Sequence, residues 1–173
     1  MISKKICLLG ASGVGKTSLV RRFVDGSFSD IYMTTIGVKI DKKIVENEGE
    51  SLNLIVWDLS GEDEFSQVQM SYLRGAAGYL LVVDGTRPAT CDKALELKSR
   101  ADQVAGDVPF VLLTNKADLA DQWRISEQDM SGLEAQGWLL AKTSAKTGAG
   151  VEEAFLLLGR QLIAGKSAGK SAP

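Results

Sequence analysis

The sequence predicts an α/β fold, with a six-stranded, mostly parallel sheet, one antiparallel edge strand and helices on both faces. Three observations support this prediction. Short apolar runs alternate with segments of helical period, one pair of runs has the pattern of a hairpin, and a glycine-rich turn at residues 10–17 joins a strand pattern to a helix pattern. The 173 residues, 45% of them hydrophobic, suffice for one domain around one core.

Four apolar runs are the predicted parallel strands, because each is short and is bounded by Gly, Pro or Asp. They are Ile6–Leu9, Tyr79–Val83, Val108–Leu113 and Trp138–Ala141. The remaining two strands are predicted at Val38–Asn47 and Ser51–Asp58. A short turn separates this pair and the second run alternates apolar with polar residues, so the pair is expected to form the hairpin that supplies the edge strand.

Three later segments have the spacing of amphipathic helices. One apolar face consists of Ala94, Leu97, Ala101 and Val104, and another of Val151, Ala154, Phe155, Leu158 and Leu162. A third helix is expected from Ser126 to Gly137, with Ser126 as its cap and Asp129 three residues later. We assign residues 1–164 to one domain, and residues 165–173, rich in Gly, Ser and Ala, to a disordered tail.

Composition excludes several classes of function. The 20 basic and 22 acidic residues leave a net charge of -2, so nothing favours a nucleic-acid partner. Histidine is absent, which excludes a Ser-His-Asp hydrolase. Cys7 and Cys91 are most simply reduced thiols. Because the sequence also shows neither a secretory signal nor a membrane span, we expect a cytoplasmic protein.

The glycine-rich turn, from Gly10 to Thr17, matches the pattern G-x-x-x-x-G-K-[ST] of a phosphate-binding loop. The glycines allow successive backbone N–H groups to curve around a triphosphate. Lys16 can neutralise the β- and γ-phosphates, and the Thr17 hydroxyl can bind Mg²⁺. The predicted phosphate-binding residues are Gly13, Val14, Gly15, Lys16, Thr17 and Ser18. This motif indicates a nucleotide without indicating which one.

Two further motifs, Asn115-Lys-Ala-Asp118 and Thr143-Ser-Ala-Lys146, follow predicted strands on the same rim. With them the chain resembles the Ras-like small GTPases, which are P-loop NTPases with a Ras-like G domain. The resemblance covers roughly residues 2–164 and is greatest to Rab-type members. It is carried by Thr34–Val38, Trp57-Asp-x-x-Gly61, Tyr72-x-Arg-Gly-Ala76 and the segment 150–155, Gly-Val-Glu-Glu-Ala-Phe.

The resemblance implies a guanine site and assigns a role to each base-binding residue. Asp118 would accept hydrogen bonds from the guanine N1–H and 2-amino group, donors that adenine lacks. Asn115 would brace the loop, the Lys116 stem would cover the base, and Phe28 would stack near the base edge. The 143–146 motif would contribute Ser144, the backbone N–H of Ala145, and Lys146.

The resemblance also implies a switch that depends on GTP, GDP and Mg²⁺. Thr35 would bind Mg²⁺ together with Thr17 and respond to the γ-phosphate, so that hydrolysis releases its loop. Asp58 would hold Mg²⁺ through water, and the Gly61 N–H would bond the γ-phosphate. The expected catalytic set is Lys16, Thr35, Gly61 and Glu62.

Glu62 is the departure from the family pattern, because most members have Gln there to orient the attacking water. An ionised carboxylate only accepts hydrogen bonds and adds negative charge beside the γ-phosphate. We therefore expect slow, Mg²⁺-dependent hydrolysis. An activating partner protein would then be needed for fast turnover.

By the same resemblance, effector, exchange-factor and GTPase-activating proteins would bind through Thr34–Val38, Trp57 and the Glu62–Tyr72 region. Trp57 could form an apolar patch with Ile36 and Tyr72, or could pack only against the hairpin. No lipid-anchor motif is visible, since no Cys follows Cys91 and residue 2 is Ile, so either the protein works without a lipid or the chain is truncated. We expect a monomer.

Three functions are weighed on this sequence. The first is a regulatory GTPase that switches between GTP and GDP states, and the second is a GTP-dependent scaffold with little or no hydrolysis, which Glu62 keeps open. The third, a small-molecule kinase, is disfavoured by the 115–118 motif and by the lack of an obvious lid.

Overall fold

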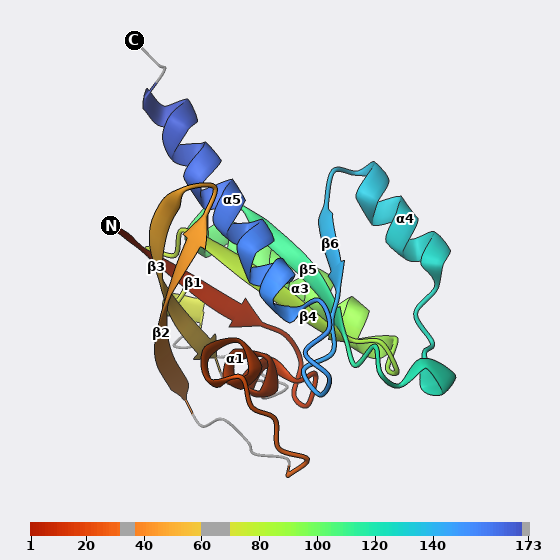
Figure 1. Ribbon diagram of the computed structural model, residues 1–173. Coiled ribbons are helices and arrows are strands. Elements are labelled where there is room, and N and C mark those ends of the chain that lie inside the picture. The colour runs from red at the N-terminus through yellow and green to blue at the C-terminus, as the bar shows by residue number, and fades with distance from the viewer. Residues whose placement is uncertain (32–36, 60–69, 171–173) are drawn as a thin grey trace.

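The computed structural model describes residues 1–31, 37–59 and 70–170, the last five as backbone only. Strands and helices are interspersed along the chain after an N-terminal strand (Figure 1). In chain order they are β1 (Ile2–Leu9), α1 (Lys16–Asp25), β2 (Val38–Asn47), β3 (Glu50–Leu59), β4 (Gly78–Asp84), α3 (Ala89–Ala105), β5 (Phe110–Asn115), η1 (Ala120–Gln122), α4 (Glu127–Ala135), β6 (Leu139–Lys142) and α5 (Val151–Lys170).

The six strands form one sheet in the order β2-β3-β1-β4-β5-β6. β2 runs antiparallel to β3, and the other neighbouring strands are parallel. The predicted fold class is therefore confirmed, including the hairpin that places β2 at the edge. Because β1, β4 and β5 are adjacent and parallel, the loops that follow them lie on one rim, where α/β sheets bind ligands.

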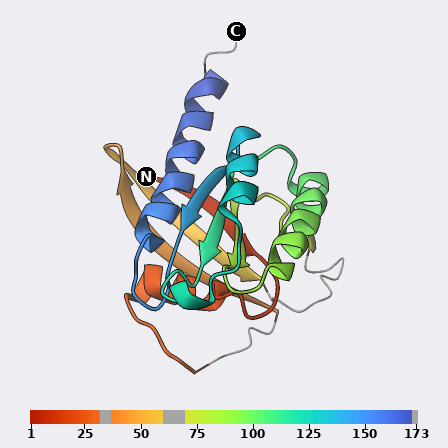
Figure 2. The ribbon, with the colours of Figure 1, turned by 90° about the vertical axis from the view of Figure 1, so that its right-hand side faces the viewer.

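Alternate residues of the central strands contribute to two cores. Ile6 and Leu8 of β1 belong to a core that includes Leu19 of α1 and Phe155 of α5. Cys7 and Leu9 belong instead to the core that contains Leu97 and Ala101 of α3. Figure 2 shows α5 and α3 on opposite sides of the sheet. Burial on both faces explains why the parallel strands appear in the sequence as continuous apolar runs.

Over residues 165–170, where the sequence predicts a tail, α5 continues to Lys170. Figure 1 shows this helix extending beyond the body of the domain. Its first turns pack through Val151, Ala154 and Phe155, so the helix is already nucleated when it leaves the core. Extension then adds one hydrogen bond per residue and needs no apolar face. Residues 171–173 lie outside the described residues.

No helix within the described residues combines the length and apolar character needed to cross a membrane.

Candidate functional site

The phosphate loop, residues 10–17, lies between β1 and α1 and has the backbone that its glycines predict. Gly13 and Gly15 have φ angles of 76° and 102°, a region that L side chains rarely adopt. A Cβ at Gly15 would lie 2.4 Å from Nδ2 of Asn115. Glycine at this position is therefore required both by the backbone angle and by the neighbouring base loop, which we define as residues 115–118.

Lys16 begins α1 and is only 6% exposed. Its ammonium group donates to the carbonyl oxygens of Gly10 at 2.9 Å and Ala11 at 3.2 Å, and so lies folded over the phosphate loop. Burial lowers the pKa of Lys16 from 10.5 to about 8, and the negative charge of Asp58 opposes this shift. An anion in the loop would supply the negative charge that this buried ammonium group lacks.

Thr17 and Asp58 bring two oxygen donors together beside Lys16. The Thr17 hydroxyl donates to Oδ2 of Asp58 at 2.6 Å, and Asp58 is fully buried near the end of β3. The parallel pairing of β1 with β3 places Asp58 opposite Leu8, one residue before the end of β1. A hydroxyl and a carboxylate are the hard oxygen ligands that Mg²⁺ accepts, so the donor set fits this metal.

Asn115 joins three segments at one buried point. Its Nδ2 donates to the Val14 carbonyl at 3.0 Å, and its Oδ1 accepts from the Thr143 hydroxyl at 3.1 Å and the Ala145 N–H at 3.3 Å. The side chain is 1% exposed. These contacts connect the phosphate loop to both segments of the predicted base site.

The second base segment, residues 143–146, orients the predicted base-reading carboxylate. The Ser144 hydroxyl donates to Oδ1 of Asp118 at 2.7 Å and accepts from the Thr147 N–H at 3.1 Å. Asp118 itself is exposed on the rim. A carboxylate that is held in this way can accept hydrogen bonds from a planar ligand on its open side.

The other predicted site residues take no part in the hydrogen bonds of the preceding paragraphs, and some of them lie outside the described residues. Ser18 lies in the first turn of α1, Phe28 is half-buried beside the α1–α5 core, and Lys146 is exposed. Thr35, Gly61 and Glu62 lie outside the described residues, as do residues 34–36 and 62–69 of the expected partner surface.

Three site residues were missed by sequence reasoning. Arg22 of α1 donates to the carbonyl oxygens of Ala145 at 2.8 Å and Lys146 at 2.5 Å, which holds the second base segment against α1. Asp84 is the last residue of β4 on the same rim, and Arg87 follows that strand. Of these three residues, only Asp84 had a sequence signal. It directly follows the predicted strand Tyr79–Val83, and the motifs of the predicted site also come after predicted strands.

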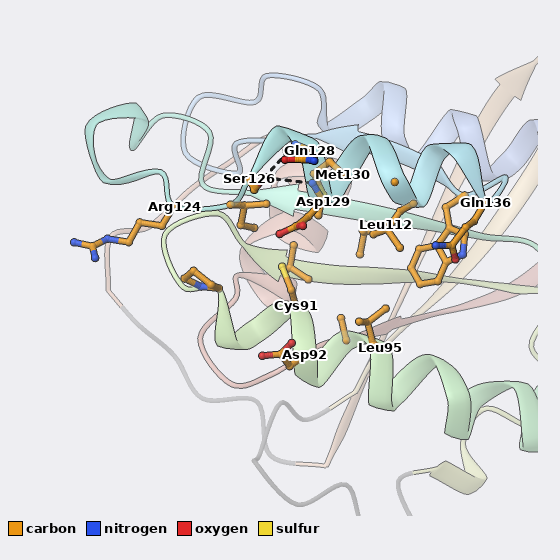
Figure 3. Close-up of a pocket in the computed structure, with 17 residues that line it drawn as sticks. Cys91, Asp92, Leu95, Leu112, Arg124, Ser126, Gln128, Asp129, Met130 and Gln136 are labelled. Carbon is orange, nitrogen blue, oxygen red and sulfur yellow. Dashed lines mark hydrogen bonds between the residues drawn. The ribbon is translucent and has the colours of Figure 1, made fainter.

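A separate cavity of about 530 Å³ lies between α3 and α4. Figure 3 shows that its lining includes Cys91 and Leu95 on α3 and Asp129 on α4. Burial raises the pKa of the Cys91 thiol to about 11, with the carboxylates of Asp92 and Asp129 adding to the effect. None of the predicted nucleotide residues lines this cavity, so it is not the candidate site.

Comparison with known proteins decides the family. Residues 5–164 match the Ras family. The chain belongs to the Ras family. It is 34% identical to Ras-related protein Rab-8B of Homo sapiens over 161 residues, covering 92% of this chain and 78% of that protein. It is 36% identical to GTP-binding protein ypt2 of Schizosaccharomyces pombe over 160 residues, covering 91% and 80%. Ras-related protein Rab-4 of Dictyostelium discoideum is 36% identical over 161 residues, covering 92% and 78%.

The Rab-type resemblance predicted from sequence is thus confirmed. This Ras-family member is a small GTP-binding protein that hydrolyses GTP and acts as a switch. Its ligand class is the guanine nucleotide, and regulator and effector proteins act on such switches. The small-molecule kinase is excluded by this membership, and no observation on the described residues favours the non-hydrolysing scaffold.

Proposed function

We propose that this GTPase holds guanine nucleotide and Mg²⁺ across the rim formed by the phosphate loop, the base loop and residues 143–146. The observation that carries the proposal is the buried Asn115 amide, whose three hydrogen bonds join all three segments. A ligand that spans the rim therefore meets a phosphate site and a base site held at a fixed distance. A nucleotide has a phosphate group at one end and a base at the other, and so matches both sites.

Each end has the chemistry that a guanine nucleotide requires. The backbone N–H groups from Gly13 to Ser18 and the Lys16 ammonium would bind the phosphates, with the dipole of α1 adding a favourable field. At the other end, Asp118 would accept from guanine while Ser144 fixes its orientation. The Ala145 N–H, which donates to Asn115 at 3.3 Å, would share its hydrogen with the base. Phe28 and the stems of Lys116 and Lys146 would border the base.

Thr17 and Asp58 are the residues that would hold Mg²⁺, completed by Thr35 in the GTP state. The metal would neutralise charge on the β- and γ-phosphate oxygens. Of this chain's own groups, the Lys16 ammonium would stabilise charge on the transferring phosphoryl group, and the Gly61 N–H would bond to the γ-phosphate. Thr35 would report the loss of that phosphate by releasing its segment.

Intrinsic hydrolysis is proposed to be slow because Glu62 replaces the water-orienting amide. A carboxylate cannot donate to a phosphate oxygen, and its charge opposes the anionic transition state. A stronger base helps little where positioning dominates the reaction. We place this switch in the cytoplasm as a monomer whose fast turnover depends on an activating protein.

Partner proteins are proposed to bind next to the nucleotide, over residues 34–38, Trp57 and residues 62–72. Trp57 and Tyr72 have ring centroids 5.9 Å apart, and the Lys5 ammonium lies 3.8 Å from the Trp57 ring centre. Ile40, paired with Trp57 across the hairpin, is exposed and extends the apolar surface. Both interpretations of Trp57 thus have support, since it packs on the sheet and borders an exposed apolar residue.

Single-turnover hydrolysis of preloaded GTP tests this function. The Glu62→Gln variant is expected to hydrolyse GTP about tenfold faster or more than the wild type, since it regains a donor to the phosphate. Glu127→Gln on exposed α4 is the matched control and should leave the rate unchanged. Equal rates in the wild type and Glu62→Gln would refute the inhibitory role of Glu62, and no turnover in either would favour the scaffold.

A further inference from the structure

Asp84 is a buried carboxylate that the proposed chemistry does not use. It ends β4, between β1 with its phosphate loop and β5 with its base loop, and its side chain is 1% exposed. The strand register places Asp84 directly opposite Asn115. A charge at this depth is costly unless it is paired and hydrogen-bonded, so its partners indicate what it holds in place.

The partners of Asp84 come from two directions. Oδ1 accepts from the N–H of Thr86 at 2.8 Å and from its hydroxyl at 2.7 Å. Oδ2 pairs with the Lys116 ammonium at 2.9 Å and with Nε of Arg87 at 3.0 Å. Burial alone would raise the pKa of Asp84, but the hydrogen bonds from Thr86, Lys116 and Arg87 hold it below its usual value. The carboxylate is therefore charged at neutral pH.

Arg87 extends this network to the phosphate loop. While its Nε bonds to Asp84, its terminal NH2 group donates to the carbonyl of Ser12 at 2.8 Å. A continuous chain of contacts thus runs from Lys116 in the base loop through Asp84 and Arg87 to Ser12. The planar guanidinium fork presents separate donors to the two neighbours, a spacing that the compact ammonium of a lysine does not reproduce.

We propose that Asp84 and Arg87 are positioning residues that couple the base loop to the phosphate loop and thereby slow nucleotide release. Release requires the loops around the ligand to separate, and displacement of either loop would pull on the shared buried carboxylate. Breaking one contact leaves that charge without full compensation, so opening is opposed at both ends of the nucleotide. The inference rests on the proposed nucleotide site.

Release of a fluorescent GDP analogue into excess unlabelled GDP tests the coupling. Arg87→Gln is expected to release the analogue about three to ten times faster than the wild type, the effect of one charge-assisted bond discounted for a side chain that is 48% exposed. Arg87→Lys keeps the charge but reaches Asp84 or the Ser12 carbonyl, one at a time. Its release rate should therefore lie between those of the wild type and Arg87→Gln. Arg160→Gln on α5 removes the same charge outside the network and should release at the wild-type rate.

Two further measurements separate positioning from general damage to the fold. The hydrolysis rate constant of preloaded GTP should stay within twofold of wild type in Arg87→Gln, because within the described residues the network does not contact Lys16. Asp84→Asn keeps the shape of the side chain, and the double variant Asp84→Asn/Arg87→Gln should release no faster than Asp84→Asn alone. Independent effects that multiply in the double variant would overturn the coupling.

The coupling is also overturned if Arg87→Gln releases the analogue within twofold of the wild-type rate. Failure of the wild type to bind the GDP analogue has a different meaning, because it removes the proposed nucleotide site itself. Tight binding together with unchanged release in the variants would leave that site standing and would refute the coupling alone.

Discussion

Asn115→Ala is the substitution that best tests whether one buried amide holds the rim together. It removes three hydrogen bonds and leaves the Val14 carbonyl, the Thr143 hydroxyl and the Ala145 N–H without this partner. At about 1 kcal/mol for each bond, the rim loses about 3 kcal/mol of support.

That loss acts on binding because a loosened rim is in its binding-competent arrangement for less of the time. Apparent affinity falls by the competent fraction, and 1.4 kcal/mol corresponds to a factor of ten. GDP affinity is therefore expected to fall by at least about tenfold, with an upper limit of about 150-fold.

Isothermal titration of the nucleotide-free protein with GDP measures this effect. Asn53→Ala is the matched control, because Asn53 is partly exposed on β3 and its side chain bonds only to the Ser3 hydroxyl among the hydrogen bonds described. It should leave the affinity unchanged. A loss in Asn115→Ala of less than threefold, equal to that of Asn53→Ala, would refute the bracing role.

Two further predictions concern the two ends of the site. Asp118→Asn should weaken GDP binding by about a hundredfold or more and shift preference to xanthine nucleotides, whereas Asp121→Asn, exposed in η1, should do neither in a competition assay. GDP affinity should also fall about tenfold from pH 7 to pH 9. Lys16, whose pKa is about 8 in the nucleotide-free protein, loses its proton over this range, while bound phosphates would hold it charged. An affinity independent of pH would show that Lys16 does not contact the phosphates.

The lowered pKa of Lys16 also determines how the folding stability of the nucleotide-free protein changes with pH. The pKa of Lys16 is lower in the folded chain than its usual 10.5, so between pH 8 and 10.5 the unfolded chain binds more protons. The contribution of Lys16 to folding stability therefore improves as pH rises through that window, and is most unfavourable below pH 8. Burying this ammonium group reduces stability in the absence of an anion, which is typical of a residue retained for binding.

The strands were predictable wherever both faces are buried, and their ends were predictable only where apolar residues reach them. β4 is buried along its whole length, and the predicted Tyr79–Val83 lies within it. β1 begins at Ile2, four residues before the predicted start, because Ser3, Lys4 and Lys5 pair with β3 through the backbone. Ladder pairing needs no apolar side chain, so a polar strand end has no hydropathy signal.

The residues of the candidate site were likewise predictable only where their sequence signal is local. The phosphate loop could be predicted because its chemistry demands glycines and a lysine at fixed local spacing. Arg22 could not, because the carbonyl groups of Ala145 and Lys146 that it binds lie 123 and 124 positions away along the chain, and only the packing of α1 brings them together. Arg87 is similar, since its bond to Ser12 spans 75 positions.

Two sets of long-range contacts lie between the two ends of the proposed nucleotide site. Asn115 joins the phosphate loop to residues 143–146. The Asp84 network joins the phosphate loop to Lys116 by a separate route. Two separate connections make partial opening costly, because moving one loop strains both. A ligand contact at either end therefore stabilises the other end, and the nucleotide is expected to dissociate in one cooperative step. A regulator that displaces either loop would then release the whole nucleotide without touching the opposite end.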